Sequence, residues 1–171
     1  MTLARKLYDY TAGKPCRLIH RRGGEPYLER YRLVYIFGFE VYLHRFVDAD
    51  VNEGFHDHPW RAFSLCLTGG YMEDRLRHLD PEVSWEPRCR CMWPGRLSRL
   101  GLATFHRIVS TRPETWTLFV HGPRRKGWGF LDGDAPNRRV IYRMAGSIFQ
   151  DNPWDEAVLG RDSERAPFGS T

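Results

Sequence analysis

The feature that most constrains the fold is a two-residue period of apolar side chains, which holds over most of the chain from Tyr27 onward. The segments are short and end at clusters of Gly, Pro or Asp, as antiparallel strands do. Helical periodicity is confined to the ends, at Leu3–Tyr10 and in a turn near Trp154–Leu159. Many short strands with little helix between them predict an all-β fold, a sandwich or a barrel. The pattern predicts about ten strands, at Leu28–Tyr35, Phe39–Val47, Arg61–Thr68, Tyr71–His78, Ser84–Met92, Gly95–Leu100, Arg107–Ser110, Thr115–His121, Gly127–Leu131 and Arg138–Tyr142.

The length of the chain, 171 residues, suits one domain with a single core. We expect a barrel over 27–145, an N-terminal segment 1–26 packed on it, and a C-terminal extension over 146–171. The last stretch of this extension, GRDSERAPFGST, is polar and is expected to be loosely held. No apolar run approaches the ~20 residues that span a bilayer, and the N-terminus lacks the apolar centre of a signal peptide, so the expected location is the cytoplasm without membrane contact. The four cysteines show no paired CxxC spacing and are expected to be reduced thiols.

The net charge of +5 and the pI near 9.2 favour anionic partners. Arginines are densest in GPRRKGWGF, where Arg124, Arg125 or Lys126 is a candidate to hold a carboxylate or phosphate. A solvated basic turn explains the same residues. Because no helix-turn-helix, basic helix or RNA-recognition motif is visible, nucleic acid is not an expected partner.

Two histidines one residue apart, His56 and His58, stand before a strand and a Gly-Gly pair. On an extended backbone their side chains point to the same face and can converge on one ion. An HxH pair alone is weak evidence, because two polar residues closing a loop give the same pattern. Imidazole nitrogens suit iron, zinc, copper or nickel, so a third ligand is the next requirement.

The segment HDHPWRAFSLCLTGG resembles the first motif of the cupin superfamily, with His56 and His58 at its histidine positions and Gly70 at its closing glycine. The glutamate of that motif would fall at Ala62 or Phe63. The segment GRLSRLGLATFHRIVS resembles the second motif in the spacing from Gly95 to His106. It departs from that motif where Gly101, Ala103 and Ser110 replace its proline, glycine and asparagine.

The chain also resembles small, largely uncharacterised cupin-like proteins of bacteria and phages that carry HDHPW, GGY, HR and WTLF…GPR…WGF segments. The resemblance implies a cupin barrel, that is, a double-stranded β-helix or jelly roll with short terminal helical segments. It also implies a homodimer. Exposed edge strands, which can pair with a second chain, are a physical reason to expect one.

The resemblance further implies a metal site of His56, His58 and His106, with Fe(II) as the expected metal and zinc, nickel or manganese as alternatives. Three neutral ligands leave the full charge on a divalent metal, which favours a small anionic organic substrate and leaves room for O2. The function expected first is a non-haem oxygenase or dioxygenase, an oxidoreductase. A non-redox isomerase, epimerase or lyase, and a non-catalytic small-ligand-binding cupin, stay open as alternatives.

Four further residues near the expected site have expected roles that follow from the alternation of side chains along an extended chain. Asp57 alternates away from the two histidines and is expected to orient an imidazole or hold the loop. His44 and Tyr42 share one face of a strand and are candidates to line the cavity, with a place on the barrel surface as the alternative for His44. Phe63 is expected to point inward with Leu65 and Leu67 and to contact substrate, although core packing also explains it.

Overall fold

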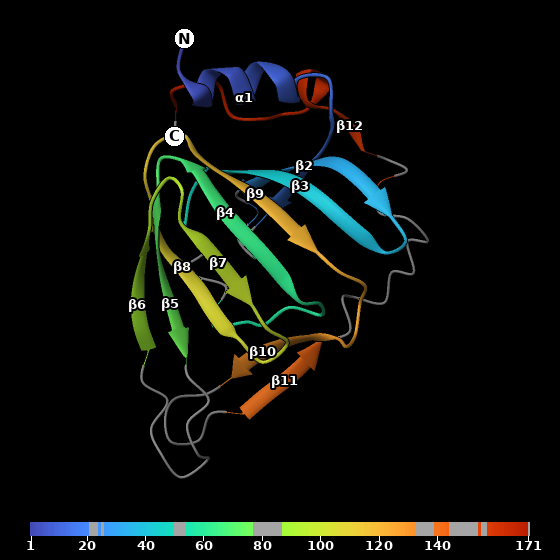
Figure 1. Cartoon of the computed structure of the whole chain (residues 1–171), viewed down its shortest axis with the longest axis vertical. Helices are drawn as coiled ribbons and strands as arrows, with labels where there is room; N and C mark the ends of the chain where they lie inside the picture. Colours follow the sequence, from blue (N-terminus) through green and yellow to red (C-terminus); the bar gives the residue numbers. More distant parts are fainter. Residues whose placement is uncertain are drawn as a thin grey trace.

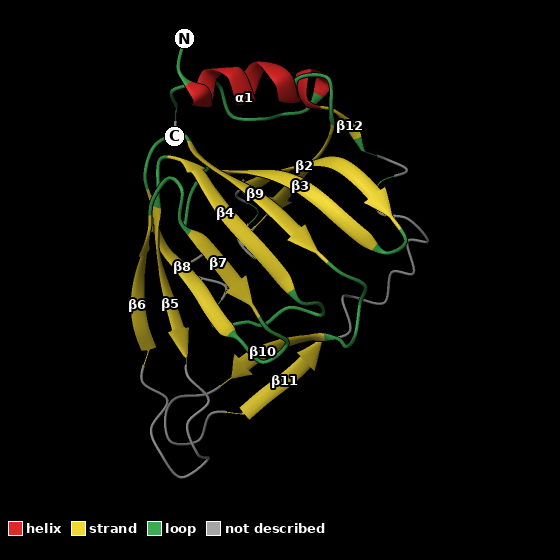
Figure 2. Cartoon of the chain, viewed as in Figure 1, coloured by secondary structure: helices red, strands yellow, loops and turns green. Residues whose placement is uncertain are grey.

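A computed structural model describes residues 1–20, 24, 26–49, 54–76, 87–132, 139–143, 154 and 157–170. These residues form antiparallel β-sheets with one α-helix and one short 3-10 helix (Figures 1 and 2). The elements are α1 (Leu3–Thr11), β1 (Pro15–His20), β2 (Pro26–Ile36), β3 (Phe39–Phe46), β4 (Ala62–Thr68), β5 (Tyr71–Leu76), β6 (Pro87–Met92), β7 (Leu97–Leu100), β8 (Phe105–Thr111), β9 (Thr115–His121), β10 (Trp128–Asp132), β11 (Arg139–Arg143), β12 (Val158–Leu159) and η1 (Gly160–Asp162).

The larger sheet has seven strands in the order β12-β1-β2-β3-β9-β4-β7. A three-stranded sheet, β6-β5-β8, lies beside it, and the hairpin β10-β11 lies at the end of the molecule away from α1 (Figure 1). Strands distant in sequence, such as β3 and β9, are neighbours. This all-β jelly-roll arrangement confirms the predicted fold class.

The seven-stranded sheet carries different side chains on its two faces, because successive residues of a strand point to opposite sides. On one face, Tyr31, Leu43 and Trp116 pack with Ala4 of α1. The amphipathic α1 begins at Thr2, whose side chain accepts a hydrogen bond from the Arg5 amide as an N-cap does. The other face, which carries Leu28 and Phe46, packs toward Tyr71 and Ile108 of the three-stranded sheet. This second face lines the inside of the barrel.

The expectation of a loosely held C-terminal stretch is wrong for residues 160–170. Arg45 donates hydrogen bonds to the carbonyl oxygens of Ala166 (2.6 Å) and Pro167 (2.9 Å). The amide of Ala166 donates to Glu29 Oε1 at 2.7 Å, and Phe168 packs edge-on against Tyr8. Buried charged groups of the sheet therefore fix a polar segment that hydropathy alone predicts to be free.

Ten strands match the predicted ones, and two, β1 and β12, were not predicted. Of the predicted segments, 77–78, 84–86 and 138 lie outside the described residues. β1 pairs with β2 and with β12 and so extends the seven-stranded sheet. The domain boundaries at 26 and 145 stay a prediction. No helix among the described residues is long and apolar enough to cross a membrane.

Candidate metal centre

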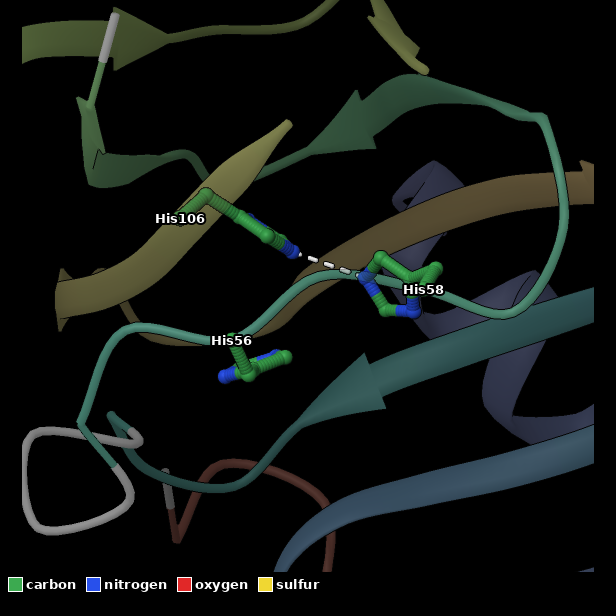
Figure 3. A group of neighbouring side chains, drawn as sticks. All are labelled: His56, His58 and His106. Atoms are coloured by element: carbon green, nitrogen blue, oxygen red, sulfur yellow. Dashed lines mark hydrogen bonds between the residues drawn. The ribbon is translucent and has the colours of Figure 1, made fainter. Parts of the chain in front are cut away.

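Three imidazoles meet on the inside of the barrel. One ring nitrogen from each of His56, His58 and His106 lies within 4.8 Å of the others, and the ring centroids are 4.9 to 5.5 Å apart. Figure 3 shows His106 on its strand and the other two on a neighbouring extended segment. Each of the three is 8% exposed. The structure thus brings together the three histidines that the cupin resemblance singles out.

Backbone hydrogen bonds place this extended segment between β8 and β10. The amide of His56 donates to the carbonyl of His106 at 3.1 Å, and the amide of His106 donates back at 2.9 Å. On the other side the amide of Leu131 donates to Phe55 at 2.9 Å. His56 is therefore fixed directly opposite His106, although fifty residues separate them in sequence.

Asp57 points away from the imidazoles, as the alternation along an extended chain predicts. It is 1% exposed, accepts a hydrogen bond from the Gly129 amide at 2.8 Å and forms an ion pair with Lys126. A Cβ atom at Gly129 would lie 2.8 Å from this carboxylate, so a larger residue would not fit there. Asp57 thus ties the histidine segment to β10 and keeps His56 and His58 turned to the cavity.

Burial keeps two of the imidazoles neutral. It lowers the pKa of His56 to about 3 and that of His58 well below its usual range, and the neighbouring imidazoles add to both effects. A neutral imidazole has one nitrogen with a free lone pair, which is the form that binds a metal. The Nδ1 atom of His56 lies 3.3 Å from the Gly54 carbonyl, which leaves Nε2 as its ligand atom.

The geometry fits a cation between the rings. Nε2 of His58 and Nε2 of His106 are 2.8 Å apart (Figure 3). Two nitrogens at this distance either share a proton or both face a cation, and ligands at right angles on ~2.1 Å metal bonds lie ~3.0 Å apart. A divalent metal would replace the shared proton with little movement of either ring. The three-histidine cluster therefore suggests a divalent metal.

Sequence reasoning missed Glu73 on β5, which also belongs to this site. Its Oε1 atom lies 3.1 Å from Nδ1 of His106 and 2.6 Å from Nε of Arg75. Burial alone would raise the pKa of Glu73, but His106 and Arg75 lower it to about 2. A carboxylate facing Nδ1 fixes the proton there and leaves Nε2 free for a metal. A signal existed: the alternation puts Glu73 on the same face as the buried Tyr71.

The imidazoles stand on the wall of a cavity of about 90 Å³. Most of its wall is apolar or aromatic, and Trp128 lies over His58 with ring centroids 4.8 Å apart. His44 is also on the wall, as expected, and burial, with help from Arg30 and His121, lowers its pKa well below the usual range. The other described wall residues are Tyr27, Leu28, Arg30, Phe46, Ser64, Tyr71, Glu73, Ser98, Leu100, Ile108 and Phe119.

The inward direction predicted for Phe63 is wrong. Its side chain is 45% exposed and lies in a separate outer hollow with Phe39 and Val120. Register explains the difference, because Ser64 pairs with Phe119 and Ser98, both on the cavity wall, so the alternate residues of β4 face outward. Ala62, Ser64 and Cys66 form its inward face.

Three other predicted substrate contacts lie off the cavity wall. Tyr42 is 3% exposed, donates its hydroxyl hydrogen to Glu40 and stacks on Trp154. Arg124 is exposed and donates to the Lys126 carbonyl. Arg125 is exposed and borders the outer hollow. Tyr42 is packed as a core residue. The basic turn faces solvent, as the alternative interpretation of a solvated basic turn predicts.

Comparison with known proteins gives likeness of structure alone. No protein-family model and no curated sequence matches the chain. The structure is similar to that of Fe(II)-HppE with the alternative substrate (S)-1-HPP, at 11% identity and a TM-score of 0.50 over 66% of this chain and 57% of that chain. It is also similar to KdgF from Halomonas sp., at 20% identity and a TM-score of 0.46 over 59% and 84% of the two chains. A variant of oxalate decarboxylase from Bacillus subtilis gives 10% identity and a TM-score of 0.48 over 67% and 28%.

The chain therefore spans just over half of HppE and about a quarter of oxalate decarboxylase. At these identities the comparison concerns the fold, which is the cupin barrel that the two histidine motifs predict. The further likeness to proteins with a HDHPW segment stays a prediction.

Proposed function

We propose that this cupin-fold chain is a mononuclear metal-dependent enzyme, a non-haem Fe(II) oxygenase that acts on a small anionic metabolite. The observation that supports this most is the convergence of three buried imidazoles, from two distant stretches of chain, on the wall of a largely apolar cavity. The likeness to a solved structure of Fe(II)-HppE favours iron over the alternatives zinc, nickel and manganese.

Each residue of the site has its own role in this proposal. His56, His58 and His106 would hold the metal, and Glu73 would orient the ring of His106 through Nδ1. The bound metal would supply a Lewis acid and a redox centre with open positions for substrate and O2. Because all three ligands are neutral, they leave its charge uncompensated, and an anionic substrate is favoured in a poorly hydrated cavity. The apolar side chains of the wall would contact the hydrocarbon part of such a substrate.

Metal analysis and oxygen uptake test this proposal. Protein purified without chelators is expected to hold about one equivalent of iron, or to take it up after reduction and loading with Fe(II). The loaded protein is then expected to consume O2 when small carboxylic and phosphonic acids are supplied. Zinc, nickel or manganese at one equivalent without O2 uptake would overturn the oxygenase in favour of an isomerase or lyase. Protein that binds none of these metals would indicate a ligand-binding cupin.

His58→Ala supplies the matched variant, because it removes one ring that points into the cavity. Metal content is expected to fall by at least about tenfold, since one of three ligands is lost, while the circular dichroism spectrum is unchanged. His20→Ala, at an exposed position on β1, is the control and should keep its metal. Unchanged metal content in the His58 variant would refute the ligand set.

The homodimer and the cytoplasmic location stay predictions. Sedimentation equilibrium of the purified chain tests the first, with a mass near 40 kDa expected from the 20.1 kDa chain.

A further inference from the structure

Arg30, which no sequence motif singles out, stands on the wall of the same cavity as the three histidines. It lies on β2 directly opposite His44 of β3. The ring of His44 stacks on Phe119 with centroids 4.9 Å apart, and Phe119 in turn lies 6.2 Å from the ring of His58. Arg30 is the one lysine or arginine among the described residues of this wall.

The contacts of Arg30 hold it in place without neutralising it. Its Nε–H donates to Nε2 of His44 at 3.1 Å, and its guanidinium lies over the ring of Tyr42, 5.2 Å from the centroid. It forms no ion pair with any residue that the structure describes. The described wall carries one carboxylate, Glu73, which is engaged by Arg75 and His106.

Arg30 is half-buried, and burial, the largest cause, lowers its pKa, while the charge of Glu40 acts in the opposite direction. A guanidinium nevertheless stays charged, because its ordinary pKa is above ~12. Since His44 occupies Nε, the edge left for a ligand is the one formed by Nη1 and Nη2. Two parallel N–H groups on that edge match the two oxygens of a carboxylate.

We propose that Arg30 binds the carboxylate of a small substrate, while the neighbouring end of the same molecule reaches the three histidines. Leu28, Phe46 and Ile108 offer the substrate an apolar surface on the same wall. The substrate class is therefore a short carboxylic acid with a metal-binding oxygen close to the carboxylate, such as a 2-hydroxy or 2-oxo acid. The reaction of the bound acid rests on the proposed function. The binding of its carboxylate depends on Arg30 alone.

Lactate and lactamide test the binding step, because they have the same shape and differ in charge. Binding is measured by calorimetry and saturation-transfer NMR, with the protein as purified and again after metal removal by a chelator. Wild-type protein is expected to prefer lactate by on the order of tenfold or more in both forms, as a charge-assisted bidentate contact predicts.

Arg30→Met is expected to abolish this preference, and Arg30→Lys to keep a reduced one because the charge stays and the paired donors are lost. Arg32→Met is the matched control, since Arg32 lies on the same strand and packs on Trp154 outside the cavity wall, and it should behave as wild type. If Arg30→Met does not fold, the reduced preference of Arg30→Lys against Arg32→Met carries the test.

Equal binding of lactate and lactamide by wild-type protein, or a full lactate preference in both Arg30 variants, would overturn the inference. The two proposals fail separately. An Arg30-dependent preference in protein that takes up no iron would leave the anion site standing without the oxygenase. Oxygen uptake that is equal in wild-type protein and in the Arg30 variants would support the oxygenase and refute the anion site.

Discussion

Two arginines on the adjacent strands β2 and β3, Arg30 and Arg45, lie on opposite faces of the same sheet. The charged groups around them differ. On the outer face, Arg45 is fully buried between Glu29 (3.2 Å) and Glu114 (2.7 Å) and also donates to two carbonyl oxygens of the C-terminal segment. On the inner face, Arg30 donates one hydrogen bond to a neutral histidine and forms no ion pair with a described residue.

The difference separates a structural charge from a functional one. A buried cation whose donors are all used holds elements together, here the sheet and the segment around Ala166. A cation that the fold leaves unpaired beside a cavity has capacity for a ligand. Substitutions that treat the two arginines identically can therefore test the distinction.

Arg45→Met is expected to have the largest effect. It leaves Glu29 and Glu114 without their cation and removes the donors that hold the C-terminal segment. The free energy of unfolding should fall by about 3 to 5 kcal/mol, the usual cost of breaking a buried ion pair, as measured by urea denaturation. Arg45→Met combined with Glu29→Met should recover part of the loss, because one stranded charge is removed as well. A loss below about 1 kcal/mol would contradict the structural role.

Glu73→Gln is expected to have the next largest effect, and on metal affinity rather than on folding. Glutamine has the size of glutamate but no negative charge, so it no longer stabilises a proton on Nδ1 of His106 electrostatically. Metal affinity should fall by about 10- to 100-fold, measured by competition with a chelating dye. Asp74→Asn is the matched control, because the neighbouring carboxylate pairs with Arg107 away from the cavity. Equal losses in the two variants would show that Glu73 acts through general electrostatics.

The three histidines could be predicted from sequence because their geometry follows from local rules and one spacing. Alternation on an extended chain places His56 and His58 on one side and Asp57 on the other. The motif spacing then supplies His106. The same rule of alternation failed at β4, where apolar side chains occupy both faces and the sequence does not show which face lines the cavity.

Arg30 required the three-dimensional structure for a different reason. Glu29 and Arg30 are adjacent charged residues on one strand, and nothing local tells which of them faces the cavity. The answer depends on partners far along the chain, since Glu29 meets Arg45 and the amide of Ala166. The ordered C-terminus has the same origin, because its polar backbone is held by groups that belong to distant strands.

The pH dependence of stability gives a third and smaller effect, through His44 on the inner face. Burial, with help from Arg30 and His121, lowers the pKa of His44 in the folded protein, whereas in the unfolded chain it returns toward its ordinary ~6.5. The unfolded state then binds the extra proton, so stability is lost as the pH falls below about 6.5. His44→Gln keeps an acceptor for Arg30 and removes the titration. Between pH 6 and pH 5 its unfolding free energy should fall by about 1 kcal/mol less than that of wild type, and parallel curves for the two proteins would show that His44 takes no part.

Arg30→Met should change stability least, which completes the comparison with Arg45→Met. The substitution removes a half-buried cation that forms no ion pair with a described residue, which is favourable, and leaves Nε2 of His44 without its donor, which costs about 1 kcal/mol. The two effects oppose each other, so the free energy of unfolding should stay within about 1 kcal/mol of wild type. A loss of the size expected for Arg45→Met would mean that Arg30 also holds the fold together, and the contrast between the two faces of the sheet would no longer mark a site for a ligand.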